Sequence, residues 1–246
     1  WDDLWLNESF AEWASHFVQG EIAARYGTGV DPWATFCNQR KTWAYRQDQL
    51  PTTHPIAADM YDLEAVELNF DGITYAKGAS TLRQLVAFVG LDEFVAGVRM
   101  YFAKNAWGNT DLADLLAELE ASSGRVLSRF TTDWLQTAGV NTMVADFDED
   151  TDGRFASFAV LQSAHPQWPT LRQHRMAIGL YDLDGDRLVR TGRVELDVDG
   201  PRTELVGKAW QSFTLGQLDD DGLIDLAVIT EDHVDLFRGV GDGSFV

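Results

Sequence analysis

The stretch Trp5-Leu6-Asn7-Glu8-Ser9-Phe10-Ala11 places one carboxylate among bulky apolar residues. From Trp5 to about Gly20, apolar residues recur with a helical period and polar residues occupy the opposite side, which predicts a helix that Asn7 could cap. A carboxylate beside apolar walls costs free energy unless its charge is compensated, and a metal ion is one compensator. Glu8 is therefore a candidate metal ligand, while periodicity alone also fits a solvated acid on a helix face.

Charge and composition limit the partners and the compartment. The 246 residues include 19 Lys and Arg against 39 Asp and Glu, so the formal net charge is -20. Such a surface repels phosphate backbones and anionic lipid, and no nucleic-acid partner is expected. No apolar run approaches the roughly 20 residues that span a bilayer, so no membrane segment is expected. Cys37 is the only cysteine, which excludes an intrachain disulfide and fits a reducing compartment, the cytoplasm.

The predicted secondary structure changes from helices to strands after about residue 140. Helical periodicity continues before that point, and further helices are expected at about 32–49, 76–89, 91–105, 112–122 and 126–137. Short β-rich runs follow it, expected at 155–162, 174–181, 188–198 and 203–206. Acidic, Gly-containing turns are expected between strands at 146–153, 182–186 and 197–200.

These segments predict an α+β multidomain fold. Residues 1–140 are expected to be all-α, residues 141–212 to form a small β-sandwich, and residues 213–246 to form a short acidic β-rich tail. The run 182–186 is similar to a calcium loop, but it lacks the downstream Glu and lies between β-runs. A hairpin turn is therefore expected there.

A second motif, Phe70-Asp71-Gly72-Ile73-Thr74-Tyr75-Ala76-Lys77-Gly78-Ala79, decides how the first is interpreted. In order and spacing, the two motifs together resemble the aminopeptidase N type zinc metallopeptidases, a gluzincin family. The agreement extends over about residues 1–210 and includes the runs 101–110 and 134–140. The resemblance implies that residues 1–140 form the C-terminal helical part of a thermolysin-like catalytic domain.

The resemblance also implies roles for particular residues. It makes Glu8 the third protein ligand of one Zn²⁺, with the two histidines of an H-E-x-x-H motif expected before Trp1. It makes Tyr75 the donor of a hydrogen bond to the oxyanion that forms when water attacks the scissile carbonyl. Glu12, one helical turn after Glu8, could line the cleft or orient a ligand. Lys77 and Gly78 are expected to shape the turn.

The tail has a different character from the rest of the chain. The run Gly216–Leu226 and the run Val240–Phe245 resemble one FG-GAP or VCBS repeat, a propeller blade whose acidic loop often binds Ca²⁺. The candidate calcium ligands are Asp219, Asp221 and Asp225, although Gln217 stands where such loops have their first Asp. One blade does not close a propeller, so a fusion, a frame change and a joined sequence all stay open. A genuine repeat would favour an extracellular location.

The resemblance implies a function. The parent protein is expected to be a zinc-dependent aminopeptidase that hydrolyses N-terminal residues from peptides, while this fragment alone is expected to be inactive. An alternative is a non-catalytic binding protein that combines an aminopeptidase-like remnant with a propeller-type module. A second alternative is an epoxide hydrolase-like relative that shares the zinc site. The motif that recognises the substrate α-amine in the family is absent from this chain.

Overall fold

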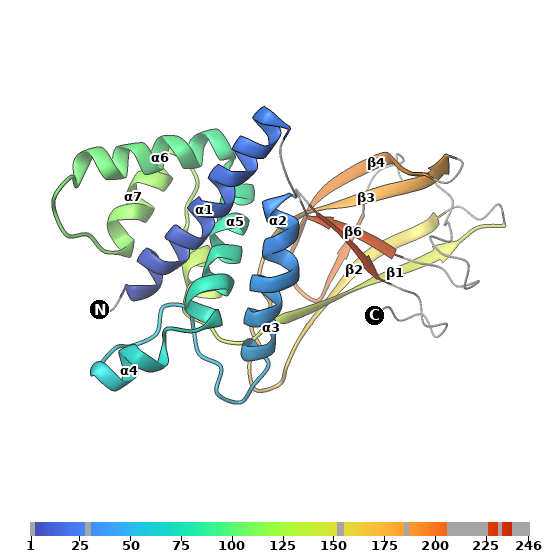
Figure 1. Ribbon diagram of the computed structural model, residues 1–246. Coiled ribbons are helices and arrows are strands. Elements are labelled where there is room, and N and C mark those ends of the chain that lie inside the picture. Colours follow the sequence, from blue (N-terminus) through green and yellow to red (C-terminus); the bar gives the residue numbers. More distant parts are fainter. Residues whose placement is uncertain are drawn as a thin grey trace. The chain divides into compact units, whose positions relative to one another are not determined.

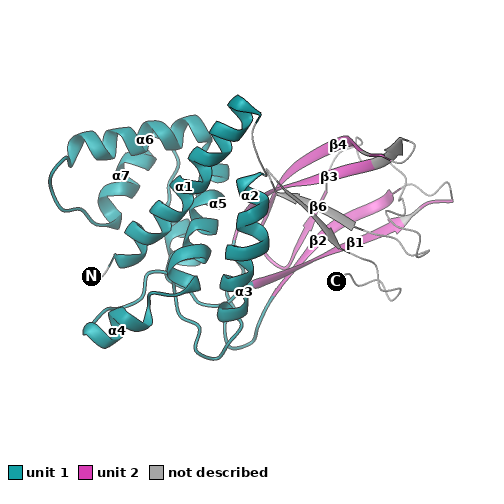
Figure 2. Cartoon of the chain, in the orientation of Figure 1, with its two compact units in different colours: residues 1–140, 164–172 teal, residues 141–163, 173–246 magenta. Residues whose placement is uncertain are grey.

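The computed structural model describes residues 3–27, 31–151, 155–184 and 187–205, together with the strands at 226–230 and 233–237. The chain divides into two compact units (Figure 2). Unit 1 comprises residues 1–140 and 164–172, and unit 2 comprises residues 141–163 and 173–246. In the described residues, the elements of unit 1 are helices and those of unit 2 are strands, so the predicted mixture of helix and sheet is confirmed.

Unit 1 places α1 beside α5, which lies far from it in sequence, and packs the consecutive helices α6 and α7 along each other (Figure 1). Segments of π-helix, labelled η, interrupt or extend several of the α-helices. The helical segments are α1 (Leu4–Tyr26), α2 (Pro32–Thr35), η1 (Phe36–Lys41), α3 (Thr42–Asp48), α4 (Leu63–Leu68), η2 (Ile73–Lys77), α5 (Gly78–Val89), α6 (Leu91–Lys104), α7 (Leu112–Ser123), α8 (Ser128–Phe130) and η3 (Thr131–Leu135).

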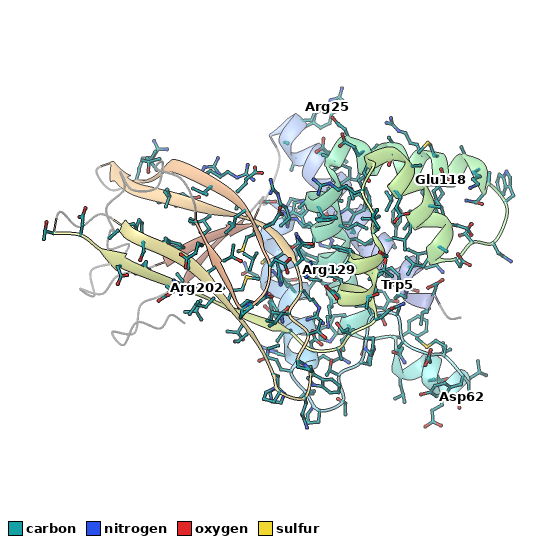
Figure 3. All side chains as sticks on the ribbon, turned by 180° about the vertical axis from the view of Figure 1, so that it is seen from behind. Trp5, Arg25, Asp62, Glu118, Arg129 and Arg202 are labelled. Carbon is teal, nitrogen blue, oxygen red and sulfur yellow. The ribbon has the colours of Figure 1, made fainter. Side chains whose placement is uncertain are left out.

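Helix α1 extends beyond the predicted bounds at both ends. It begins at Leu4, so Asn7 lies inside the helix and the predicted Asn7 cap is wrong. Leu4 and Trp5 are buried, and their burial favours a helix that starts before the motif. Gly27 ends α1 in the left-handed conformation, with φ 64°, and its N–H donates to the Ala23 carbonyl. Trp5 and Arg25 lie near the opposite ends of α1 (Figure 3).

The core of unit 1 is aromatic and fixes the orientation of α1. Trp13 stacks on Phe17, with ring centroids 5.0 Å apart, and meets the edge of the fully buried Phe94 at the same centroid distance. Burial of side chains of this size stabilises a fold by roughly 1.5–3 kcal/mol each. Because the apolar side of α1 faces this core, the carboxylates of Glu8 and Glu12 lie on a face that is only partly buried.

Residues 164–172 return from the strands to join unit 1. The buried guanidinium of Arg172 donates to the carbonyl oxygens of Asp133 at 2.8 Å, Thr137 at 3.1 Å and Ala138 at 3.1 Å. These carbonyls lie at and beyond the end of η3, where helical backbone acceptors lack partners. Arg172 therefore closes the C-terminal end of the helical unit.

Unit 2 contains the strand order β1-β2-β5 and the hairpin β3-β4. The hairpin is antiparallel from His174 opposite Val198 to Asp184 opposite Arg187, so the predicted hairpin is confirmed, although the turn predicted from residue 182 is wrong at its start because β3 continues to Asp184. The interpretation of 146–153 as a turn is wrong in its first half, because β1 continues to Glu149. The strands are β1 (Asn141–Glu149), β2 (Phe155–Ala164), β3 (His174–Asp184), β4 (Arg187–Val198), β5 (Arg202–Glu204), β6 (Leu226–Thr230) and β7 (His233–Phe237).

The tail is described only in part. Strands β6 and β7 pair antiparallel, with Leu226 opposite Phe237. The candidate calcium ligands Asp219, Asp221 and Asp225 lie outside the described residues, so the predicted Ca²⁺ loop and the FG-GAP resemblance stay predictions. Among the helices in the described part of the chain, none has both the length and the apolar character needed to cross a membrane.

Candidate active site

The structure brings Glu8 and Tyr75 together. Glu8 lies on α1 and Tyr75 lies in η2, and the Glu8 carboxylate is close enough to the Tyr75 hydroxyl to affect its ionisation. Burial and the neighbouring Glu8 carboxylate raise the pKa of Tyr75 above its ordinary value, so its hydroxyl keeps its proton at neutral pH. Both side chains are partly exposed. A proton donor therefore stands beside the carboxylate that the sequence predicts as a metal ligand.

Asp71 positions the segment that carries Tyr75. Its Oδ1 atom accepts the N–H groups of Ile73 and Thr74, each at 2.9 Å, and its carbonyl oxygen accepts the N–H of Tyr75 at 3.1 Å. A carboxylate in this place satisfies amides that have no helical partner and interacts favourably with the positive end of the helix dipole. The Asp in the second motif thus defines where η2 begins.

His54 contacts the carboxylate oxygen of Asp71 that does not bind the η2 amides. Its Nε2 atom lies 2.8 Å from Asp71 Oδ2, and its Nδ1 atom lies 2.7 Å from the carbonyl oxygen of Pro55. Both partners are acceptors, so the contacts favour the imidazolium, which donates from both nitrogens. Burial lowers the pKa of His54, but the hydrogen bonds to Asp71 and Pro55 outweigh it and raise the pKa above 6.5.

Glu12 is held in an ion pair with Arg40 of η1. Arg40 Nε lies 2.7 Å from Glu12 Oε1, and Arg40 Nη2 lies 3.0 Å from Oε2. Arg40 also covers the ring of Trp43, with its guanidinium carbon 4.8 Å from the ring centroid. The charge of the second carboxylate on this face of α1 is therefore compensated by a cation from the chain itself.

Lys77 faces a different set of partners from Tyr75. Its ammonium lies 2.7 Å from the buried Asp48 carboxylate and donates to the Gly139 carbonyl at 3.2 Å. Burial lowers the pKa of Lys77, and Asp48 partly opposes this effect. These contacts agree with the expectation that Lys77 shapes the turn.

Comparison with protein families identifies the helical unit. The model described as "Peptidase family M1 domain" matches residues 1–134, which include Glu8, Glu12 and Tyr75. The chain belongs to peptidase family M1. This finding confirms the resemblance to aminopeptidase N type peptidases that the two motifs predict.

Individual aminopeptidases also resemble the chain, one of them over most of its length. The chain is 53% identical to "Aminopeptidase N" of Streptomyces lividans over 94% of this chain and 29% of that protein. It is 40% identical to "Probable aminopeptidase 2" of Sulfurisphaera tokodaii over 56% of this chain and 17% of that protein. It is 37% identical to "Leucyl aminopeptidase" of Saccharolobus solfataricus over the same shares. The chain thus spans less than a third of the length of these relatives.

The metal expected of family M1 can be tested against the residues present. Within the described residues, no group of three His, Cys, Asp or Glu side chains could hold a metal ion. His16 packs on Phe36 and bonds to the Glu12 carbonyl, and His54 is held between Asp71 and Pro55. Glu8 has the donor type and the partial exposure that fit one zinc ligand. The expectation of two histidine ligands before Trp1 stays a prediction.

The sequence did not predict the roles of several residues around the site. Arg40 and His54 carry no motif of their own, and their partners Glu12 and Asp71 lie 28 and 17 residues away. Ser9 stands inside the first motif, but its neighbours in space belong to the second one. The one available signal was that Asp71 precedes a helical segment, as capping residues do.

Proposed function

We propose that the chain forms part of a zinc-dependent aminopeptidase that hydrolyses N-terminal residues from peptides. Membership of family M1 supports a peptidase, and the names of the relatives support action at the N-terminus. The observation that carries the proposal is the proximity of the Tyr75 hydroxyl on η2 to the Glu8 carboxylate on α1, two elements that pack together. It joins the residues that the two motifs single out, although 67 positions separate them along the chain.

In this proposal Glu8 contributes one carboxylate oxygen to the metal site. Zinc, when bound, polarises the scissile carbonyl and lowers the pKa of water. Tyr75 keeps its hydroxyl proton and donates a hydrogen bond to the carbonyl oxygen as negative charge develops there. A donor in a fixed position stabilises that charge without reorganising during the reaction.

Glu12 is proposed to line the site as part of its wall. Both of its oxygens are already bound by Arg40, so its carboxylate is committed to an ion pair. A change at Glu12 should therefore act through Arg40 and the surface around Trp43, and should leave zinc content unaltered.

The finer fold assignments belong to the same proposal. Residues 1–140 would be the C-terminal helical part of a thermolysin-like domain, and residues 141–212 a β-sandwich. A buried cluster supports the sandwich, because Phe158 and Val160 of β2 pack with Ile178 of β3 and Val198 of β4. Such packing between the inner faces of two sheets is what a sandwich requires.

The test is the zinc content of the longer protein that we propose contains this chain, measured with its turnover of an aminoacyl amide. Glu8→Ala should lower bound zinc well below one equivalent and abolish turnover. Glu21→Ala changes an exposed carboxylate on the same helix and should alter neither quantity. One equivalent of zinc and full turnover in Glu8→Ala would refute the proposal.

A further inference from the structure

Ser9 links the two segments that carry Glu8 and Tyr75. It follows Glu8 in α1, its side chain is fully buried, and its hydroxyl donates a 2.6 Å hydrogen bond to the carbonyl oxygen of Thr74. Thr74 directly precedes Tyr75 and is also fully buried. One buried hydrogen bond thus joins the immediate neighbours of the two proposed active-site residues.

Gly78 allows this contact to form. A Cβ atom at Gly78 would lie 1.8 Å from the Ser9 hydroxyl oxygen and 2.7 Å from the Ser9 Cβ. The backbone of Gly78 is ordinary right-handed helix, with φ -61°, so its conformation does not require glycine. Space alone requires glycine here, because the Ser9 side chain occupies the volume that any side chain at residue 78 would need.

The acceptor of this hydrogen bond is itself held in place. The N–H of Thr74 donates to Asp71 Oδ1 at 2.9 Å, while its carbonyl receives the Ser9 hydroxyl. Both backbone groups of Thr74 are therefore engaged, one by the cap of η2 and one by α1. A shift of α1 relative to η2 would have to break a buried hydrogen bond or compress Ser9 against Gly78.

We propose that Ser9 is a positioning residue that sets the separation between the Glu8 carboxylate and the Tyr75 hydroxyl. The inference rests on the proposed function, because it assigns Ser9 to the same site. The hydroxyl fixes the approach of α1 to η2 in one direction by its hydrogen bond and in the other by contact with Gly78. Ser9 is fully buried with its hydroxyl bound to the Thr74 carbonyl, so in this proposal it acts on turnover only through Tyr75.

The first test is a double-mutant cycle in the zinc-loaded enzyme, with turnover expressed per bound zinc. Ser9→Ala should lower kcat roughly fivefold to tenfold, the order expected for loss of one buried hydrogen bond, while KM and zinc content stay unchanged. In a Tyr75→Phe background, Ser9→Ala should lower kcat no further, because the hydroxyl that Ser9 positions is gone. Ser15→Ala, at an exposed serine of α1, is the matched control and should leave kcat unchanged.

The second test exploits the contact with Gly78. Gly78→Ala should lower kcat more than Ser9→Ala does, and Ser9→Gly combined with Gly78→Ala should recover much of that loss by vacating the space. If Gly78→Ala does not fold, the double-mutant cycle of Ser9→Ala and Tyr75→Phe still decides whether Ser9 positions Tyr75.

The outcomes separate the inference from the proposed function. If Tyr75→Phe lowers kcat as expected, two results would overturn the positioning role of Ser9 alone. One is an unchanged kcat in Ser9→Ala, and the other is an equal loss of kcat from Ser9→Ala in the wild-type and Tyr75→Phe backgrounds. Unchanged kcat in Tyr75→Phe itself overturns the proposed function, and the role of Ser9 falls with it.

Discussion

The guanidinium of Arg40 binds both carboxylate oxygens of Glu12, with Nε 2.7 Å from Oε1 and Nη2 3.0 Å from Oε2. The pair joins α1 to η1 beside the proposed active site. Its side chains differ in exposure, at 37% for Arg40 and 11% for Glu12, so solvent screens the pair in part. A two-point contact nevertheless restricts both side chains to one arrangement.

This geometry predicts a measurable coupling between the two residues. Glu12→Gln and Arg40→Gln should each lower the free energy of unfolding, and the double variant should lose less than the sum of the two. The coupling is expected to be about 0.5–1 kcal/mol, the upper part of the range for partly exposed pairs, because the contact has two hydrogen bonds. Urea unfolding of the four proteins measures it, and strictly additive losses would show that the pair contributes nothing.

His54 predicts a pH dependence of stability. Its folded pKa is raised above 6.5 by the hydrogen bonds to Asp71 and Pro55 that outweigh burial, so the folded protein holds this proton more tightly than the unfolded chain does. The resulting stabilisation is fully present below about pH 6.5 and is lost as pH rises through the raised pKa. The groups that face the ring are Asp71, which favours its charge, and Lys77, which opposes it.

Unfolding free energies measured from about pH 5.5 to 9 check this prediction. The difference between the wild-type protein and His54→Gln should be largest at the acidic end and should shrink toward the alkaline end. Asp71→Asn should weaken the same pH dependence, because it removes the carboxylate that favours the imidazolium. A difference that is constant with pH, or that grows with pH, would contradict the assignment of His54 as a charged group.

A side chain at residue 139 should destabilise the fold by a steric clash, and the same substitution at Gly124 serves as the control for backbone strain. Gly139 has φ 81°, and a Cβ there would lie 2.6 Å from the Cβ of Trp168. Gly124 has φ 67° with nothing within 4 Å of such a Cβ, so Gly124→Ala should cost only the roughly 1–2 kcal/mol of left-handed strain. Gly139→Ala should cost about 1–3 kcal/mol more, the range for overpacking. Equal losses of melting temperature in the two variants would rule out the Trp168 contact as a constraint.

The long helices and the β3-β4 hairpin were predictable because their signals are local. Helix α7 has Asp111 as its cap, and the capping box with Asp114 agrees with the predicted start. Helix α4 was missed because its six residues include the exposed Leu63 and Leu68, which leaves no apolar stripe. Strand β1 was missed, since the first expected strand begins at residue 155, because Asp146 and Asp148 look like turn residues but alternate with other side chains along an extended strand.

The candidate site was predictable in its motif residues and not in the contacts that support them. Glu8, Glu12 and Tyr75 stand in or beside recognisable stretches of sequence. The partners that hold this region depend on tertiary contacts across 17, 28 and 65 residues, between His54 and Asp71, Arg40 and Glu12, and Ser9 and Thr74. Periodicity and capping rules describe neighbours within one or two turns, so they carry no information about such pairs.

The turnover of Tyr75→Phe, measured per bound zinc in the intact enzyme, tests the central claim most directly. Loss of one preorganised oxyanion donor should lower kcat by about a hundredfold to a thousandfold, while the zinc content stays at the wild-type value because the Glu8 carboxylate is retained. Tyr45→Phe, at an exposed tyrosine of α3, is the matched control and should leave kcat unchanged. A Tyr75→Phe enzyme with wild-type kcat would contradict the assignment of Glu8 and Tyr75 to one active site.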